Sequence, residues 1–286
     1  PAFILSAYFT CMVRCDGAPN VVMAAVVAGG IFNVFGDWFL VFPMNMGMTG
    51  AAIATAGGTV IQLMVLCAFL FTKKSHLKIV KPWEPSKAVY KAVTAGFSAS
   101  VLEFAFIILT CILNNQIMRY GGETALSVFG VILTCSGMFQ HIYTGVGQAM
   151  QPIATTNYGA GKRKRIAYLR RISEWTVIVM GICFMLTGIL FPTQLIDFFV
   201  DATPEVLRAA PTIMRIYFLS FPCMGINIWA TFYFQSIMRT RTSAVLTILR
   251  GIVVSGIFLY LLPIWLGING VWWAMVLTEG IVTGIT

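Results

Sequence analysis

Long apolar stretches, separated by short polar loops, follow one another along the whole chain. Each is close to the roughly 20 residues that an α-helix needs to cross the hydrocarbon core of a bilayer. The nine stretches cover residues 1–15, 20–43, 47–71, 89–118, 124–157, 165–192, 204–238, 240–265 and 267–286. This pattern predicts an all-α membrane protein, a polytopic helical bundle to which this chain contributes nine helices.

The charge of the loops alternates, and this alternation predicts how the helices are oriented. Basic residues gather in the loops at 73–91 and 162–171, and Arg239 and Arg241 form a third basic loop. The loops between them are uncharged or mainly acidic, as at 193–208. Because Lys and Arg loops stay on the cytoplasmic side, we expect loops 73–91 and 162–171 to be cytoplasmic. The chain is then a multi-pass protein of the cell membrane, with the lipid bilayer as its partner.

Composition supports a membrane location and excludes several other classes. Hydrophobic residues make up 58% of the 286 and charged residues only 10%, whereas a soluble domain carries about 25% charge. The net charge of +9 does not indicate nucleic-acid binding, because the basic residues lie in short loops and form no continuous face. The seven cysteines form no CxxC pair. His141 has no second ligand at metal-binding spacing, so we expect neither a metal nor a cofactor.

An internal repeat relates the first part of the chain to the last. Residues 36–54 align with residues 256–274 at an offset of 220, and five small or turn-forming positions coincide. The coinciding pairs are Gly36/Gly256, Pro43/Pro263, Gly47/Gly267, Gly50/Gly270 and Ala54/Ala274. Parallel repeats of six helices would explain this alignment, in which case three helices of the first repeat are not in this chain. The alternative is chance agreement of Gly and Pro in apolar sequence.

The repeat suggests a division into two lobes and a linker. Residues 1–72 would be the remainder of an N-terminal lobe, and residues 73–88 a basic cytoplasmic linker. Residues 89–286 would be a C-terminal lobe of six helices. The predicted fold is therefore two pseudo-symmetric six-helix lobes.

Three motifs resemble the multidrug and toxic compound extrusion (MATE) transporters. They are NVFGDWFLVFPMNMGMTGAAIAT, GQAMQPIATTNYGAGKRKR, and the run from YFQSIMRT to LLPIWLGINGVWWA. The resemblance covers nearly all of the chain in matching order and begins at the family's fourth helix. It implies two six-helix lobes around a V-shaped cavity. It also implies export of amphipathic, often cationic, small molecules in exchange for H⁺ or Na⁺.

Two positions are expected to couple transport to a cation. Glu103 lies near the middle of an apolar stretch with no basic residue within one helical turn. A charge there costs about 2.5–3.5 kcal/mol on the insertion scale, so a functional role is favoured over a neutral structural glutamate. Glu103 resembles the seventh-helix glutamate of the sodium-coupled branch of the family. Where that branch has a tenth-helix aspartate, this chain offers Asn227.

A polar stripe predicts the wall of a substrate cavity. Gln140, Tyr143, Gln148 and Gln151 share one face of a long helix, and such amide and phenol groups suit varied ligands. Hydrogen bonding between helices would explain them equally well. Asp37 is also assigned to the cavity, with anchoring at the membrane interface as the alternative.

The intramembrane arginine of the penultimate stretch needs a partner of opposite charge. Arg250 is mid-helix, and Glu279 in the last stretch is one candidate partner. We expect a structural ion pair between them, and a substrate contact is the alternative. Arg215 lies near a helix end and is expected to extend outward to water.

Three function classes differ in what they require of the sequence. A secondary exporter of drugs or metabolites, working as a monomer by rocking of two lobes, fits the repeat and the isolated carboxylate. A flippase for lipid-linked oligosaccharides would need a strongly basic cavity. A membrane enzyme would need an HExxH, GxSxG or paired-carboxylate motif, and the sequence has none. The sequence therefore predicts a transporter, not an enzyme.

Overall fold

The computed structural model describes residues 2–72, 75–76, 85–199 and 203–286, and for most of residues 85–106 it describes the backbone alone. In these ranges every regular element is helical. Contacts within the chain divide it into two units, Pro1–Trp83 and Glu84–Thr286. The division falls within the stretch 73–88 that the sequence analysis assigns to a linker.

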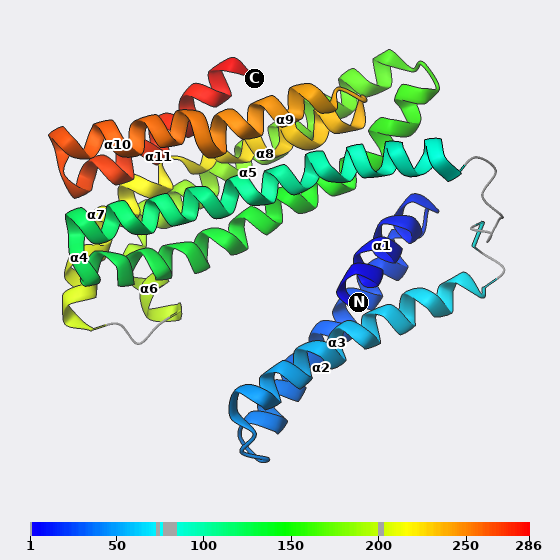
Figure 1. Cartoon of the computed structure of the whole chain (residues 1–286), viewed down its shortest axis with the longest axis horizontal. Coiled ribbons are helices and arrows are strands. Elements are labelled where there is room, and N and C mark those ends of the chain that lie inside the picture. Colours follow the sequence, from blue (N-terminus) through cyan, green and yellow to red (C-terminus); the bar gives the residue numbers. More distant parts are fainter. Residues whose placement is uncertain (1, 73–74, 77–84, 200–202) are drawn as a thin grey trace. The chain divides into compact units, whose positions relative to one another are not determined.

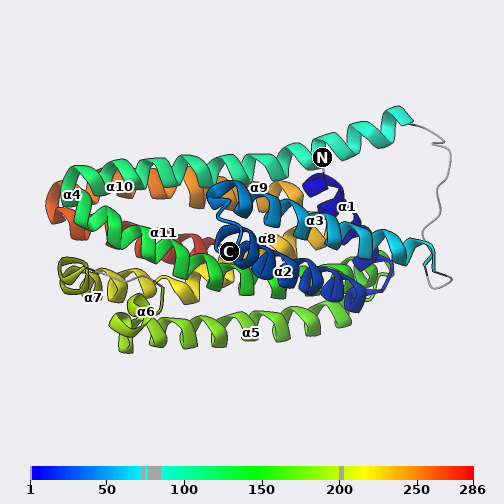
Figure 2. The same cartoon turned by 90° about the horizontal axis from the view of Figure 1, so that it is seen from below.

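The first unit consists of α1 (Ala2–Cys15), α2 (Pro19–Val41) and α3 (Gly47–Leu70). In Figures 1 and 2, α2 and α3 lie along each other as a hairpin. Glycines allow their backbones to approach, since a Cβ on Gly29 would lie 2.6 Å from the carbonyl oxygen of Gly58. Close packing of small residues is the usual way for helices to associate in lipid.

The second unit contains the remaining helices and the larger core. Its elements are α4 (Pro85–Gly159), α5 (Arg163–Leu190), α6 (Pro192–Phe199), α7 (Pro204–Phe218), α8 (Phe221–Ser236), α9 (Thr240–Ile248), the π-helical turn η1 (Leu249–Val253), α10 (Val254–Leu266) and α11 (Ile268–Ile285). Aromatic side chains fill the core, and the rings of Phe218 and Phe221 stack with centroids 4.4 Å apart. Trp272 of α11 is completely buried beside Phe129.

Most helix breaks lie close to the predicted boundaries, and α6 is a helix that the sequence did not predict. Gly122 has a φ of +66° and separates α4 into two arms, which run back along each other in Figures 1 and 2. The predicted span 204–238 is bent by 44° between Phe218 and Phe221. The predicted loop 193–208 instead contains α6, which forms because Pro192 favours a first helical turn and Ile196 is fully buried.

The two repeated corners share their turn geometry. Gly47 precedes the first turn of α3 with a φ of +53°, and Gly267 precedes α11 with a φ of +57°. This left-handed region favours glycine. The aligned prolines differ, since Pro43 follows the end of α2 whereas Pro263 lies inside α10.

Among the described residues, six helices are long and apolar enough to cross a membrane. The bent pair α7–α8 would make seven if it counts as one span. The surface is strongly apolar, with Phe71, Met48 and Trp265 exposed by 90%, 88% and 87%. Soluble proteins rarely expose large apolar areas, which mark surfaces that face a membrane or another protein.

Candidate functional site

The penultimate span is interrupted by the π-helical turn η1, and Arg250 lies in that turn. A π turn adds a residue to one helical turn and is frequent at functional sites. Gly251, which follows Arg250, is buried. The interruption therefore coincides with the one arginine that the sequence places in mid-span.

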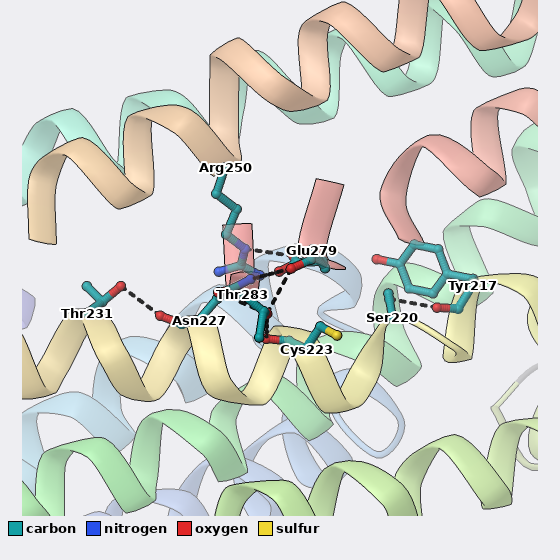
Figure 3. Close-up of polar contacts among 8 residues, drawn as sticks. All are labelled: Tyr217, Ser220, Cys223, Asn227, Thr231, Arg250, Glu279 and Thr283. Atoms are coloured by element: carbon teal, nitrogen blue, oxygen red, sulfur yellow. Dashed lines mark hydrogen bonds and ion pairs between the residues drawn. The ribbon is translucent and has the colours of Figure 1, made fainter. Parts of the chain in front are cut away.

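Arg250 forms an ion pair with Glu279 of α11. Its Nε donates a hydrogen bond of 2.6 Å to Glu279 Oε1. The side chain of Arg250 is 23% exposed and that of Glu279 only 2%. In Figure 3, Arg250 extends from its helix onto Glu279. A buried carboxylate needs such a partner, because an unpaired charge inside a protein is strongly unfavourable.

Asn227 of α8 holds the other oxygen of the same carboxylate. Its Nδ2 donates to Glu279 Oε2 at 2.7 Å and lies 3.1 Å from the backbone carbonyl of Glu279. Both carboxylate oxygens therefore have a donor. Hydrogen bonds to a charged group are shorter and stronger than neutral ones, so this network ties α8, η1 and α11 together.

Thr283, one turn further along α11, completes the network. Its hydroxyl lies 3.2 Å from Asn227 Oδ1, 3.2 Å from the carbonyl of Cys223 and 2.8 Å from the carbonyl of Glu279. A hydroxyl has one proton and donates to one of these oxygens at a time. Figure 3 shows Asn227 and Cys223 on α8 facing Glu279 and Thr283.

A cavity of about 150 Å³ lies beside the ion pair, between helices of the second unit. Its polar lining comes from α4, α7, α9, η1 and α11 and consists of Thr110, Gln140, Tyr217, Thr247, Arg250 and Glu279. The remaining lining is mainly leucine and methionine. A mostly apolar pocket with a few convergent polar groups is typical of a small-molecule site.

The predicted cavity stripe on α4 divides between several environments. Gln140 lines the cavity, whereas Tyr143 is completely buried in the core and donates to the carbonyl of Phe221 at 3.1 Å. Gln151 Nε2 lies 3.4 Å from Gln235 Oε1, a contact between helices. Gln148 is half-buried. The structure therefore brings one of the four side chains to this cavity.

The first unit holds a second polar cluster on α2 and α3. Asp37 is half-buried, and its Oδ1 is buried without a hydrogen-bond partner among the described residues. Asn33 lies one turn earlier on the same face and donates from Nδ2 to Thr55 Oγ1 at 3.2 Å. Neither Asn33 nor Thr55 was predicted from the sequence as a site residue. The four-residue spacing of Asn33 and Asp37 is the signal that could have found the first.

The structure describes the side chain of Arg215 but not that of Glu103. Glu103 belongs to α4, but its side chain lies outside the described residues. Arg215 is exposed and donates from Nε to the carbonyl of Ile189 at 3.3 Å. Among the described residues, no group of three or more His, Cys, Asp or Glu side chains could hold a metal ion.

A model of the MatE family matches residues 95–261. Multidrug export protein MepA of Staphylococcus saprophyticus is 22% identical over 272 residues, which cover 94% of this chain and 59% of the relative. MepA of Staphylococcus aureus is 22% identical over 274 residues, with the same coverage of 94% and 59%. The chain therefore spans about three fifths of the length of these curated relatives.

Solved structures share the fold. An outward-facing MATE family transporter of the MOP superfamily superposes with a TM-score of 0.89 at 21% identity, over 96% of this chain and 62% of that one. MATE in complex with MaL6 gives a TM-score of 0.92 at 20% identity, over 99% and 65%. The chain is thus an all-α, multi-pass membrane protein, a polytopic helical bundle.

Proposed function

The chain belongs to the MatE family, and from that membership we propose that the protein is a secondary active exporter of amphipathic small molecules. The observation that carries the proposal is the ion pair of Arg250 and Glu279 inside the helical bundle, next to a cavity of about 150 Å³. Charged side chains within spanning helices are costly, and they mark substrate and ion pathways. The names of the MepA relatives, which are multidrug export proteins, support the same function.

We also propose that export is coupled to entry of H⁺ or Na⁺. Asp37 supports this, because an unpartnered buried carboxylate oxygen can accept either a proton or a metal cation. Asn33, one turn away on α2, adds an uncharged oxygen ligand to the same face. Glu103 is the second proposed coupling residue, because it is an acidic residue near the middle of an apolar stretch of the sequence. For Asn227 we propose a structural role in place of cation coupling, because its side-chain amide already donates a hydrogen bond to the carboxylate of Glu279.

The remaining parts of the proposal concern the membrane and the transport cycle. The protein is placed in the cell membrane as a monomer, with the basic loops 73–91 and 162–171 on the cytoplasmic side. Two lobes rock against each other so that the cavity opens to each side in turn. A flippase for lipid-linked oligosaccharides is less well supported, since Arg250 is the only basic side chain among the described residues that line the cavity.

Efflux from proteoliposomes tests the proposed function. The protein is reconstituted, the vesicles are loaded with a fluorescent cationic dye, and a pH gradient or a sodium gradient is imposed. Dye movement driven by one gradient is the expected result, and it identifies the coupling ion. Protein-free vesicles are the control. Movement under neither gradient, with reconstitution verified, would contradict ion-coupled export of such cations.

A further inference from the structure

Arg250 uses only part of its hydrogen-bonding capacity in the ion pair. A guanidinium has five N–H donors in a planar fork, and the Nε donor is the one bonded to Glu279. The two terminal nitrogens have no hydrogen-bond partner in the described part of the chain. The side chain is 23% exposed and lines the cavity. The arginine thus presents donors to the cavity while it remains paired with Glu279.

We infer that this cavity binds the carboxylate group of a small amphipathic molecule, and that Glu279 takes up one proton as the carboxylate binds. The planar fork of arginine matches the two oxygens of a carboxylate, and such pairs are often bidentate. Thr110, Gln140 and Thr247 add polar groups around the same space. The inference rests on the proposed function and specifies one chemical class of its substrates.

The apolar part of the cavity suits an aromatic or short aliphatic body. Leu109, Leu133 and Met275 belong to its lining. The volume of about 150 Å³ equals that of an engineered apolar cavity in another protein that binds benzene. A benzoate-sized head group therefore fits beside Arg250, and methionine can adapt to different bodies.

Charge balance requires the proton. The resting pair of Arg250 and Glu279 has no net charge, so a bound carboxylate would leave one uncompensated negative charge in the membrane interior. Such a charge is strongly unfavourable unless a nearby group neutralises it. A proton from the solvent that binds Glu279 restores neutrality, and Arg250 then faces the carboxylate of the ligand. One anion and one proton bind together.

Glu279 is the group that can accept this proton. The other titratable side chains that face it are Tyr143, Tyr217 and Cys223, besides Arg250. The phenols and the thiol already carry a proton when neutral, and arginine is charged at all accessible pH values. Binding of the carboxylate should therefore strengthen as pH falls, because it takes up a proton.

A pair of matched probes tests the inference on the purified protein in detergent. The probes are 4-butylbenzoate and 4-butylbenzamide, which have nearly the same shape and differ in charge. Isothermal titration at pH 6, 7 and 8 should show the carboxylate binding at least about tenfold more tightly than the amide at pH 6. The affinity of the amide should not change with pH. Titrations in two buffers of different ionisation enthalpy should report one proton taken up per carboxylate.

Three variants locate the effect. In Glu279→Gln the affinity for the carboxylate should no longer depend on pH, because the side chain is permanently neutral. The double variant Arg250→Gln with Glu279→Gln should bind both probes equally. Because it removes both charges together, it avoids an unpaired buried charge, and it carries the test if the single variant does not fold. Arg215→Gln, which changes an exposed arginine outside the cavity lining, should behave as the unmodified protein.

Equal affinities for the two probes in the unmodified protein would overturn the inference. So would a carboxylate preference that survives in the double variant. Ion-driven dye efflux without any carboxylate preference would overturn this inference and leave the proposed function intact. A carboxylate preference that depends on Arg250, in a protein without ion-driven efflux, would support the site and contradict the proposed function.

Discussion

The side-chain amide of Asn227 lies 2.7 Å from Oε2 of Glu279, the oxygen that Arg250 does not reach. Asn227→Leu keeps a similar volume and removes this donor. Because Glu279 is 1% exposed, water cannot replace the lost hydrogen bond. We expect the free energy of unfolding to fall by about 1.5–3 kcal/mol, the range for hydrogen bonds to charged groups. Thermal unfolding in detergent, followed by tryptophan fluorescence, measures this loss.

Thr231→Val is the matched control on the same helix. The Thr231 hydroxyl donates to the backbone carbonyl of Asn227 at 3.0 Å, and hydroxyl bonds of this type within a helix contribute little. We expect a change within about 0.5 kcal/mol. Equal losses in the two variants would show that the amide of Asn227 does not stabilise Glu279.

The second repeated corner should not tolerate a side chain at its close approach. A Cβ on Gly270 would lie 2.5 Å from the backbone carbonyl of Leu262, so Gly270→Ala forces α10 and α11 apart. Overpacking of this kind costs about 1–3 kcal/mol. Gly280→Ala, on the same helix with open space around it, should be neutral or slightly stabilising. Similar unfolding midpoints for the two variants would contradict this packing.

The helical spans could be predicted from sequence because each one depends on local composition. Apolar runs of sufficient length gave boundaries within a few residues of most observed helices, and Gly47 and Gly267 marked both corners. α6 was missed because its eight residues are too few for a periodic pattern. The bend between α7 and α8 was missed because the predicted span runs through it, although Ser220 and Pro222 are residues that favour the start of a new helix.

Only part of the candidate site could be predicted from the sequence, because its contacts depend on how the helices are rotated about their axes. Few charges lie within the spans, so Arg250 and Glu279 could be named as possible partners from the sequence. The contact of Asn227 with Glu279 depends on how α8 and α11 are rotated about their axes. The π turn at Arg250 changes that rotation locally, and no residue pattern indicates it. The same difficulty explains why Tyr143 lies in the core while Gln140 lies at the cavity.

Tyr143 should act through packing rather than through substrate contact. Its hydroxyl donates to the Phe221 carbonyl from a completely buried position. We expect Tyr143→Phe to lower the free energy of unfolding by about 1 kcal/mol, the net value of a typical hydrogen bond. The dye preference of the transporter should not change. Gln140→Ala is the comparison, and it should alter dye preference because Gln140 lines the cavity. A changed dye preference in Tyr143→Phe at normal stability would contradict the assignment.

Asp37 should be required for ion-coupled efflux but not for folding. Its Oδ1 is buried and has no hydrogen-bond partner in the described part of the chain. Asp37→Asn therefore removes a charge without breaking a hydrogen bond to Oδ1. We therefore expect the free energy of unfolding to stay the same or to rise. Ion-driven dye efflux from proteoliposomes should fall at least about tenfold, because the amide can neither take up a proton nor neutralise a bound cation.

Asp197→Asn is the control, since Asp197 is an exposed carboxylate on α6. It should leave both stability and efflux unchanged. Full ion-driven efflux in Asp37→Asn would move the coupling role to another carboxylate, and Glu103→Gln would then be the variant to measure. Loss of efflux together with a lowered unfolding midpoint would instead assign Asp37 a structural role, because a coupling residue without a partner contributes nothing to folding.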